Sequence, residues 1–117
     1  MTDGKTELYK MLYNHPSSDK THDEILDELE ERFKDYETMR EVDYKELGNK
    51  KDKGEIDLVV PMEDTTRFYE VKSCAGLSDL DRAQEQIERQ KRTFENQTEN
   101  IEYWIRLGSL EIKYAEM

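Results

Sequence analysis

Apolar residues recur at helical spacing in two parts of the N-terminal third of the chain. Ile25, Leu29 and Phe33 follow one another every four residues, so residues 21–33 are predicted to form a helix. Residues 5–13 carry a shorter apolar stripe of the same period, and the chain is broken by a proline between the two segments. The chain is therefore predicted to open with two helices.

Downstream of residue 36 the pattern changes, because apolar and polar residues alternate as they do in half-buried strands. Five strands are predicted from this period and from the turn residues between them, over residues 36–47, 55–60, 67–73, 101–107 and 110–114. A longer helix is predicted over residues 79–96, where Ala83 and Ile87 lie on one apolar stripe. Ser78 precedes it and is a good N-cap residue. The order helix, three strands, helix, two strands predicts an α/β domain.

The strand over residues 55–60 is rich in apolar residues on both sides of one aspartate. Because alternate side chains share a face of a strand, Ile56, Leu58 and Val60 are predicted to lie together on one face. Asp57 is predicted to lie on the opposite face, and the apolar residues on both sides of it in the sequence suggest that it is buried.

A turn over residues 62–65 would join this strand to the next one and fix their register. Antiparallel pairing around that turn places Val60 opposite Arg67 and Asp57 opposite Glu70. Directly opposed side chains have Cβ atoms about 4.5–5.5 Å apart. Two ionised carboxylates at that separation repel each other, and a divalent cation between them removes the repulsion. Oxygen ligands alone suit Mg²⁺ or Mn²⁺.

Lys72 follows Glu70 by two residues, so both side chains share a face. The ammonium group could stabilise charge that develops at a phosphorus centre, or position the attacking water. A bound metal ion would polarise the phosphate and lower the pKa of water. Asp57, Glu70 and Lys72 are therefore predicted to form a catalytic site for metal-dependent phosphodiester hydrolysis. The alternative is a cross-strand ion network on a solvated face, which contributes little stability.

The same residues carry a resemblance to a known family. Asp57, twelve intervening residues and then Glu70-Val71-Lys72 resemble the PD-(D/E)XK nuclease superfamily. The segments GEIDLVV and FYEVKS are especially similar to small Holliday-junction-resolvase-like endonucleases. Ile56 stands where the family name has a proline.

This resemblance implies the fold, the activity and the cofactor. It covers about residues 21–107 of a single domain spanning 1–117, and implies a restriction-endonuclease-like α/β domain with a mixed central sheet flanked by helices. It implies a metal-dependent DNA endonuclease that uses Mg²⁺, with Mn²⁺ able to substitute. The small size favours selection of DNA structure, as in Holliday junction resolution or repair, over reading of a long sequence.

The superfamily often adds a glutamate from its first core helix, and two residues qualify. Glu24 lies about eleven residues before the Asp35-Tyr36 corner, as in relatives that bear GEIDLVV, and is the preferred third metal ligand. Its structural alternative is a capping box with Thr21. Glu28 lies one turn later, and its alternative is a solvated helix face.

Three further polar residues on the predicted helices are considered for the site. Some relatives use a glutamine on the helix after the Glu-x-Lys strand, and Gln86 and Gln90 lie on or beside the stripe of helix 79–96. A buried amide needs a hydrogen-bond partner. Gln86 is expected to hold the lysine or a metal-bound water, unless it belongs to a polar rim. His22 points toward the stripe of helix 21–33, and we interpret it as a buried, hydrogen-bonded histidine rather than a catalytic one.

The net charge of −11 complicates a nucleic-acid partner, because proteins that bind phosphates usually present a basic patch. Two local groups of basic residues could contact a DNA backbone: Lys45, Lys50, Lys51 and Lys53, and Arg82, Arg89, Lys91 and Arg92. A homodimer could join basic strips of two protomers, as paired cuts by resolvase-like relatives require. An acidic helix turned away from DNA, bound cations or a saline medium could equally account for the charge. DNA and a second copy of the chain are the expected partners.

Composition points to an intracellular protein. No apolar stretch approaches the roughly 20 residues that span a bilayer, and the N-terminus lacks the layout of a signal peptide. The single cysteine, Cys74, cannot form an internal disulfide or a zinc cluster. A cytoplasmic location without membrane contact is expected.

Two other functions are compatible with the sequence. A non-catalytic protein-interaction module of the same fold would bind its partner through the acidic surface and show no metal-dependent thermal shift. An acidic mimic of DNA would array negative charge along one elongated face, and would not explain Lys72 beside Glu70.

Overall fold

Two helices and five strands make up the part of the chain that the computed structural model describes, residues 20–45, 47, 53–74, 76–95 and 100–114. They follow one another as α2 (His22–Arg32), β1 (Met39–Asp43), β2 (Glu55–Pro61), β3 (Thr66–Lys72), α3 (Leu77–Thr93), β4 (Ile101–Leu107) and β5 (Leu110–Lys113). This is the predicted order of elements. The helix predicted over residues 5–13 lies outside the described residues.

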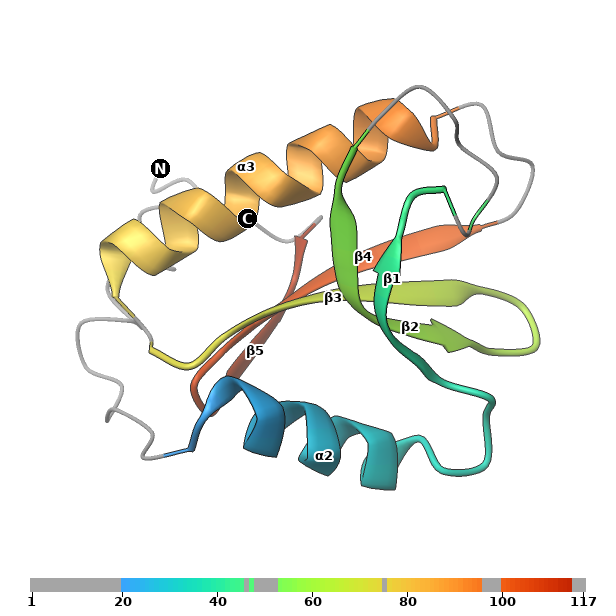
Figure 1. Ribbon diagram of the computed structural model, residues 1–117, viewed down its shortest axis with the longest axis horizontal. Coiled ribbons are helices and arrows are strands. Elements are labelled where there is room, and N and C mark those ends of the chain that lie inside the picture. The colour runs from blue at the N-terminus through green and yellow to red at the C-terminus, as the bar shows by residue number, and fades with distance from the viewer. Residues whose placement is uncertain (1–19, 46, 48–52, 75, 96–99, 115–117) are drawn as a thin grey trace, which may run out of the picture.

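The strands form one mixed sheet in the order β1-β2-β3-β4-β5. Strands β3 and β4 are parallel, and α3 is the crossover that joins them, while the other neighbours are antiparallel. Helices α2 and α3 lie on opposite sides of the sheet (Figure 1). The prediction of an α/β fold with a mixed central sheet flanked by helices is confirmed.

Each helix buries an apolar stripe against its own face of the sheet. The cluster under α2 is Ile25, Leu26, Leu29, Phe33, Leu58, Val60, Tyr69 and Val71. The cluster under α3 is Leu80, Ala83, Ile87, Ile105, Leu107, Leu110 and Ile112. A third cluster, of β1, β2 and β3 with the end of α3, is Val42, Tyr44, Ile56, Val59, Phe68 and Phe94. Neither described helix is long and apolar enough to cross a bilayer.

The start of α2 is fixed by the predicted capping box. The Glu24 backbone N–H donates to Thr21 Oγ1 at 3.2 Å, and the Thr21 N–H donates to Glu24 Oε1 at 3.1 Å. Two N–H groups that the helix cannot satisfy internally are thereby paired. The box sets the helix start at His22.

The start of α3 differs from the prediction. Gly76, not Ser78, is the N-cap, and the helix begins at Leu77. The Leu80 N–H donates to the Gly76 carbonyl at 3.0 Å, so the helix starts earlier than predicted. Ser78 thus lies exposed in the first turn of the helix, and Leu80 belongs to its buried stripe.

In the middle of β1 and β2 the side chains stop alternating regularly between the two faces of the sheet. The alternating pattern of the sequence does not predict this exchange of faces. Leu58 packs under α2, whereas Ile56 packs on the α3 side, so the prediction that they share a face is wrong. The β1–β2 register skips Glu41 and Asp57, between Arg40↔Leu58 and Val42↔Ile56. Glu41 has φ of 50°, a left-handed conformation that costs a residue with a Cβ atom about 1 kcal/mol. As a result, Asp57 lies just beyond the end of the β2–β3 ladder.

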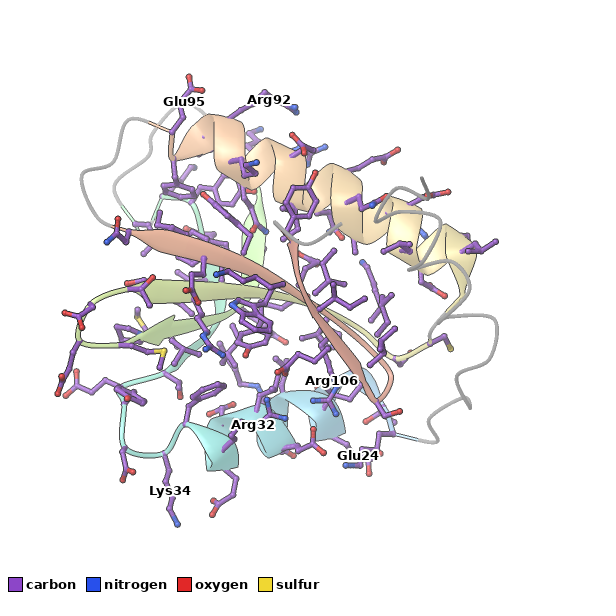
Figure 2. The ribbon with its side chains drawn as sticks, turned by 180° about the vertical axis from the view of Figure 1, so that it is seen from behind. Glu24, Arg32, Lys34, Arg92, Glu95 and Arg106 are labelled. Atoms are coloured by element: carbon purple, nitrogen blue, oxygen red, sulfur yellow. The ribbon has the colours of Figure 1, made fainter. Side chains whose placement is uncertain are left out.

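A network of charged side chains ties α2 to the β4–β5 hairpin. Arg106 is buried, its Nη2 is paired with Glu28 of α2, and its Nε donates to the Gly108 carbonyl. Arg32, near the other end of the helix, binds both carboxylate oxygens of Glu111 at 2.8 and 2.9 Å. Figure 2 shows Arg106 and Arg32 at the contact between α2 and the sheet. The network fixes α2 and its first turn relative to the sheet.

Gly54→Ala is expected to destabilise the entry to β2. A Cβ atom at Gly54 would lie 2.5–2.8 Å from the ring end of Tyr44. Tyr44 is buried and packs edge-on against Phe94, so its ring cannot move aside freely. Overpacking of this kind costs about 1–3 kcal/mol, and thermal unfolding should show a lower Tm. Gly76→Ala, whose Cβ would meet, among the described residues, the Asp79 carboxylate at 3.0 Å, should lower the Tm less. An equal or smaller loss for Gly54→Ala would contradict the expectation.

Candidate active site

Asp57 stands where β2 separates from β3. The β2–β3 register matches the prediction, with Val60 opposite Arg67, and the ladder ends at the pair Leu58↔Tyr69. One residue further, the Asp57 carboxylate replaces a backbone partner: its Oδ2 accepts a hydrogen bond of 2.8 Å from the Val71 N–H. This bond orients a buried carboxylate, 8% exposed, toward the β3 strand that carries Glu70.

Glu70 is the most deeply buried carboxylate of the site, at 1% exposure. Burial raises its pKa to about 9, and the charge of Asp57 and a hydrogen bond with Asp57 act in the same direction. Lys72 and Gln90 oppose this shift of the pKa without cancelling it. Asp57 and Glu70 therefore influence each other's charge, although the β2–β3 ladder ends one pair before the predicted pairing of Asp57 with Glu70.

Lys72 brings the positive charge of the site. Its Nζ lies 4.0 Å from Glu70 Oε1, too far for a direct hydrogen bond but near enough for attraction. Its side chain is 24% exposed, whereas that of Glu70 is 2% exposed. The lysine side chain is thus accessible to solvent, whereas the carboxylate that it attracts is not.

Further carboxylates surround Asp57 on β1 and β2. Burial, followed by the charges of Asp57, Glu41 and Asp43, raises the pKa of Glu55. Asp43 and Glu55 are direct cross-strand partners, an arrangement of like charges that weakens a sheet. This end of the two strands thus concentrates negative charge.

His22 lies in the site, although the sequence suggested a buried core histidine. It is the first residue of α2, its side chain is 38% exposed, and its Nε2 is 3.5 Å from Asp57 Oδ2. Its ring also faces Asp23, since Nδ1 lies 3.8 Å from Asp23 Oδ1. Ligand atoms of His22, Asp23 and Glu41 all lie within 4.8 Å of one another. The helical angle of His22 indicated its direction, but its contact with Asp57 depends on how α2 docks.

The two helix glutamates have other partners. Glu24 belongs to the capping box, and Figure 2 shows it at the outer end of α2. Glu28 pairs with Lys20 at 2.6 Å and with Arg106, and its pKa is lowered, first by the hydrogen bond from Lys20. Within the described ranges, these hydrogen bonds and ion pairs direct both carboxylates to groups other than Asp57. His22 is the residue that α2 brings to Asp57.

The glutamine that reaches the site is Gln90. Its side chain is fully buried, and its Nε2 donates to Glu70 Oε2 at 3.3 Å. Gln86, the glutamine preferred from the sequence, lies one turn earlier, and its buried Oε1 has no hydrogen-bond partner within the described part of the chain. Both residues lie on the inner face of α3, so helical periodicity could not separate them.

The residues present fit a divalent cation. Asp57 and Glu70 are both buried, and the charge of Asp57 adds to the effect of burial in raising the pKa of Glu70. Lys72 alone does not neutralise them at 4.0 Å. Carboxylate oxygens are the ligands that hard divalent cations prefer.

Comparisons of the chain with protein-family models, with curated proteins and with solved structures find no match. Interpretation of the site therefore rests on its geometry and on the chemistry of its residues.

Proposed function

We propose that the protein is a metal-dependent endodeoxyribonuclease of the PD-(D/E)XK type that hydrolyses phosphodiester bonds in DNA. The observation that carries this proposal is the convergence of Asp57, Glu70 and Lys72, from two adjacent strands, on one partly buried position. A cross-strand ion network on a solvated face does not account for it, because Asp57 and Glu70 are buried.

Each residue has a distinct role in the proposed reaction. Asp57 and Glu70 would hold the cation, Mg²⁺ or Mn²⁺, which would polarise the phosphodiester and lower the pKa of a water molecule bound to it. The Val71 N–H fixes the Asp57 carboxylate, and Gln90 fixes that of Glu70. Lys72 stabilises charge that develops on the phosphoryl oxygens, or orients the water that attacks.

Of the basic residues predicted to contact DNA near the hairpin, Lys45 and Lys53 belong to the described part of the chain, and Lys50 and Lys51 lie outside it. Lys45 and Lys53 are exposed and line a cavity of about 190 Å³ beside Gly54, at the entry to β2. Arg92 lies at the end of α3 remote from Glu24 (Figure 2), whereas Arg82 lies near the start of the same helix. We propose that the lysines at the entry to β2 contact the phosphates of a branched or otherwise structured DNA site.

A homodimer is the assembly that would place two such sites on one branched DNA. A second protomer would also add its own basic residues to the surface, because a two-fold axis repeats every side chain. Light scattering with and without a four-way DNA junction measures the oligomeric state of the protein. A monomer in both conditions would reject the dimer.

Cleavage assays on branched, duplex and single-stranded DNA test the activity. Wild-type protein is expected to cut at least one substrate with Mg²⁺ or Mn²⁺ and to lose activity with a chelator. Asp57→Asn and Glu70→Gln are expected to lose cleavage, whereas Glu63→Gln, on the exposed turn of the same hairpin, should retain it. No cleavage of any substrate, or equal cleavage by Asp57→Asn, would reject the proposed function.

A further inference from the structure

His22 differs from the other groups around Asp57, because it brings nitrogen to a site whose carboxylates offer only oxygen. Its Nε2 lies 3.5 Å from Asp57 Oδ2. With 38% of its side chain exposed, the imidazole is accessible to solvent. At 3.5 Å, His22 Nε2 and Asp57 Oδ2 are close enough to bind the same cation.

The second ring nitrogen supports this orientation. Histidines that bind metals through one nitrogen usually direct the other toward a carboxylate, which sets the tautomer and increases the basicity of the ligand. Asp23 stands in that place, with Oδ1 3.8 Å from His22 Nδ1. The arrangement leaves Nε2 facing Asp57.

The surrounding structure holds His22 in position. The capping box of Thr21 and Glu24 fixes the first turn of α2, and the pair of Glu28 and Arg106 fixes the helix against the sheet. The side chain of His22 takes no part in the capping box or in the Glu28–Arg106 pair. The position of the His22 backbone therefore does not depend on the His22 side chain.

We propose that His22 Nε2 is a ligand of the cation held by Asp57 and Glu70, and that this nitrogen makes the site select Mn²⁺ over Mg²⁺. The inference rests on the proposed function. Mg²⁺ takes oxygen ligands in near-ideal octahedral geometry. Mn²⁺ also prefers carboxylate and water ligands, but as a first-row transition metal it accepts an imidazole beside them more readily than Mg²⁺ does. Asp57 and Glu70 alone would favour Mg²⁺. The additional nitrogen donor shifts the expected cation to Mn²⁺.

Pulsed electron paramagnetic resonance of Mn²⁺-loaded protein tests the ligand directly. Hyperfine coupling to an imidazole nitrogen is expected in the wild type and should disappear in His22→Gln. His15→Gln, which removes the other histidine of the sequence, is the matched control and should keep the coupling. Thermal unfolding without metal checks that His22→Gln folds, since the capping box is intact in that variant.

Metal titrations test the selectivity. His22→Gln is expected to lower the affinity for Mn²⁺ by about tenfold or more and the affinity for Mg²⁺ by less than about threefold. His22→Glu, which offers oxygen instead, should shift the preference toward Mg²⁺. Equal losses for both ions in His22→Gln would overturn the proposed selectivity.

The outcomes separate this inference from the proposed function. If Mn²⁺ binds and Asp57→Asn abolishes the binding, but no nitrogen coupling is present, His22 is only an ion-pair partner of Asp57. The nuclease proposal then stands and the inference fails. If neither ion binds in a way that depends on Asp57 and Glu70, both fail.

Discussion

Lys72→Met is expected to reduce DNA cleavage by about 10²–10³-fold, the usual loss when one preorganised group that stabilises transition-state charge is removed. Methionine keeps most of the aliphatic length of lysine and removes the ammonium group. Lys72 has no hydrogen bond to Glu70, since Nζ lies 4.0 Å from Oε1, so its loss breaks no short contact there. The folded structure should therefore survive, and the deficit should appear in the rate of the chemical step.

The measurement must separate chemistry from cation binding. The positive charge of Lys72 lowers the pKa of Glu70, so its removal favours the protonated carboxyl group and weakens the cation site. Single-turnover cleavage at saturating Mn²⁺ or Mg²⁺ removes this effect. Lys34→Met changes an exposed lysine just after the end of α2 and is the matched control. Lys72→Met that cleaves at more than half the wild-type rate would exclude a catalytic role for Lys72.

The parts of the site that depend on local pattern were predictable from the sequence. The β2–β3 register follows from the length of the turn, because Val60 and Arg67 must pair once residues 62–65 turn. The ladder ends at Leu58↔Tyr69, and the Asp57 carboxylate reaches β3 by accepting a hydrogen bond of 2.8 Å from the Val71 N–H. Period and turn length are enough for the register, since both are properties of a few adjacent residues, but they do not predict this side-chain contact.

The parts that depend on tertiary placement were not predictable. Gln86 and Gln90 share one face of α3, and only the position of the helix along β3 decides that Gln90 meets Glu70. His22 meets Asp57 because α2 docks with its first turn beside β2. The exchange of faces at Glu41 requires a positive φ, which no alternating pattern signals.

Glu70→Gln is expected to stabilise the metal-free protein above neutral pH and to flatten its stability profile. Burial, and then Asp57, raise the pKa of Glu70 from its ordinary value of 4.5 to about 9 in the folded protein. Between these values the folded chain holds a proton that the unfolded chain has released. Stability rises with pH where the unfolded state binds more protons, and here it binds fewer, so the free energy of unfolding falls as pH rises. The slope from Glu70 approaches about 1.4 kcal/mol per pH unit.

Thermal unfolding at pH 5 and pH 8, with a chelator present, measures this contribution. As the pH rises from 5 to 8, the Tm of the wild type should fall by about 4 °C or more relative to the Tm of Glu70→Gln. A change of about 1 kcal/mol in the free energy of unfolding moves the Tm of a domain of this size by several degrees. The substituted amide can accept from Gln90 Nε2 and donate to Asp57, so the variant keeps the contacts of a protonated Glu70. Glu63→Gln removes an equal charge from an exposed turn and should follow the wild type.

Addition of Mn²⁺ should then reverse the order of the two proteins at pH 8. A cation that binds only the folded state stabilises it by RT ln(1 + [L]/Kd), and it needs the ionised carboxylate of Glu70. The wild type should gain Tm with increasing Mn²⁺, and the gain should grow from pH 6 to pH 8 as the cation competes with fewer protons. Glu70→Gln should gain little at any pH. Parallel pH profiles for the two metal-free proteins would show that Glu70 is ionised in the empty site, and the repulsion between Asp57 and Glu70 would then no longer support a cation between them.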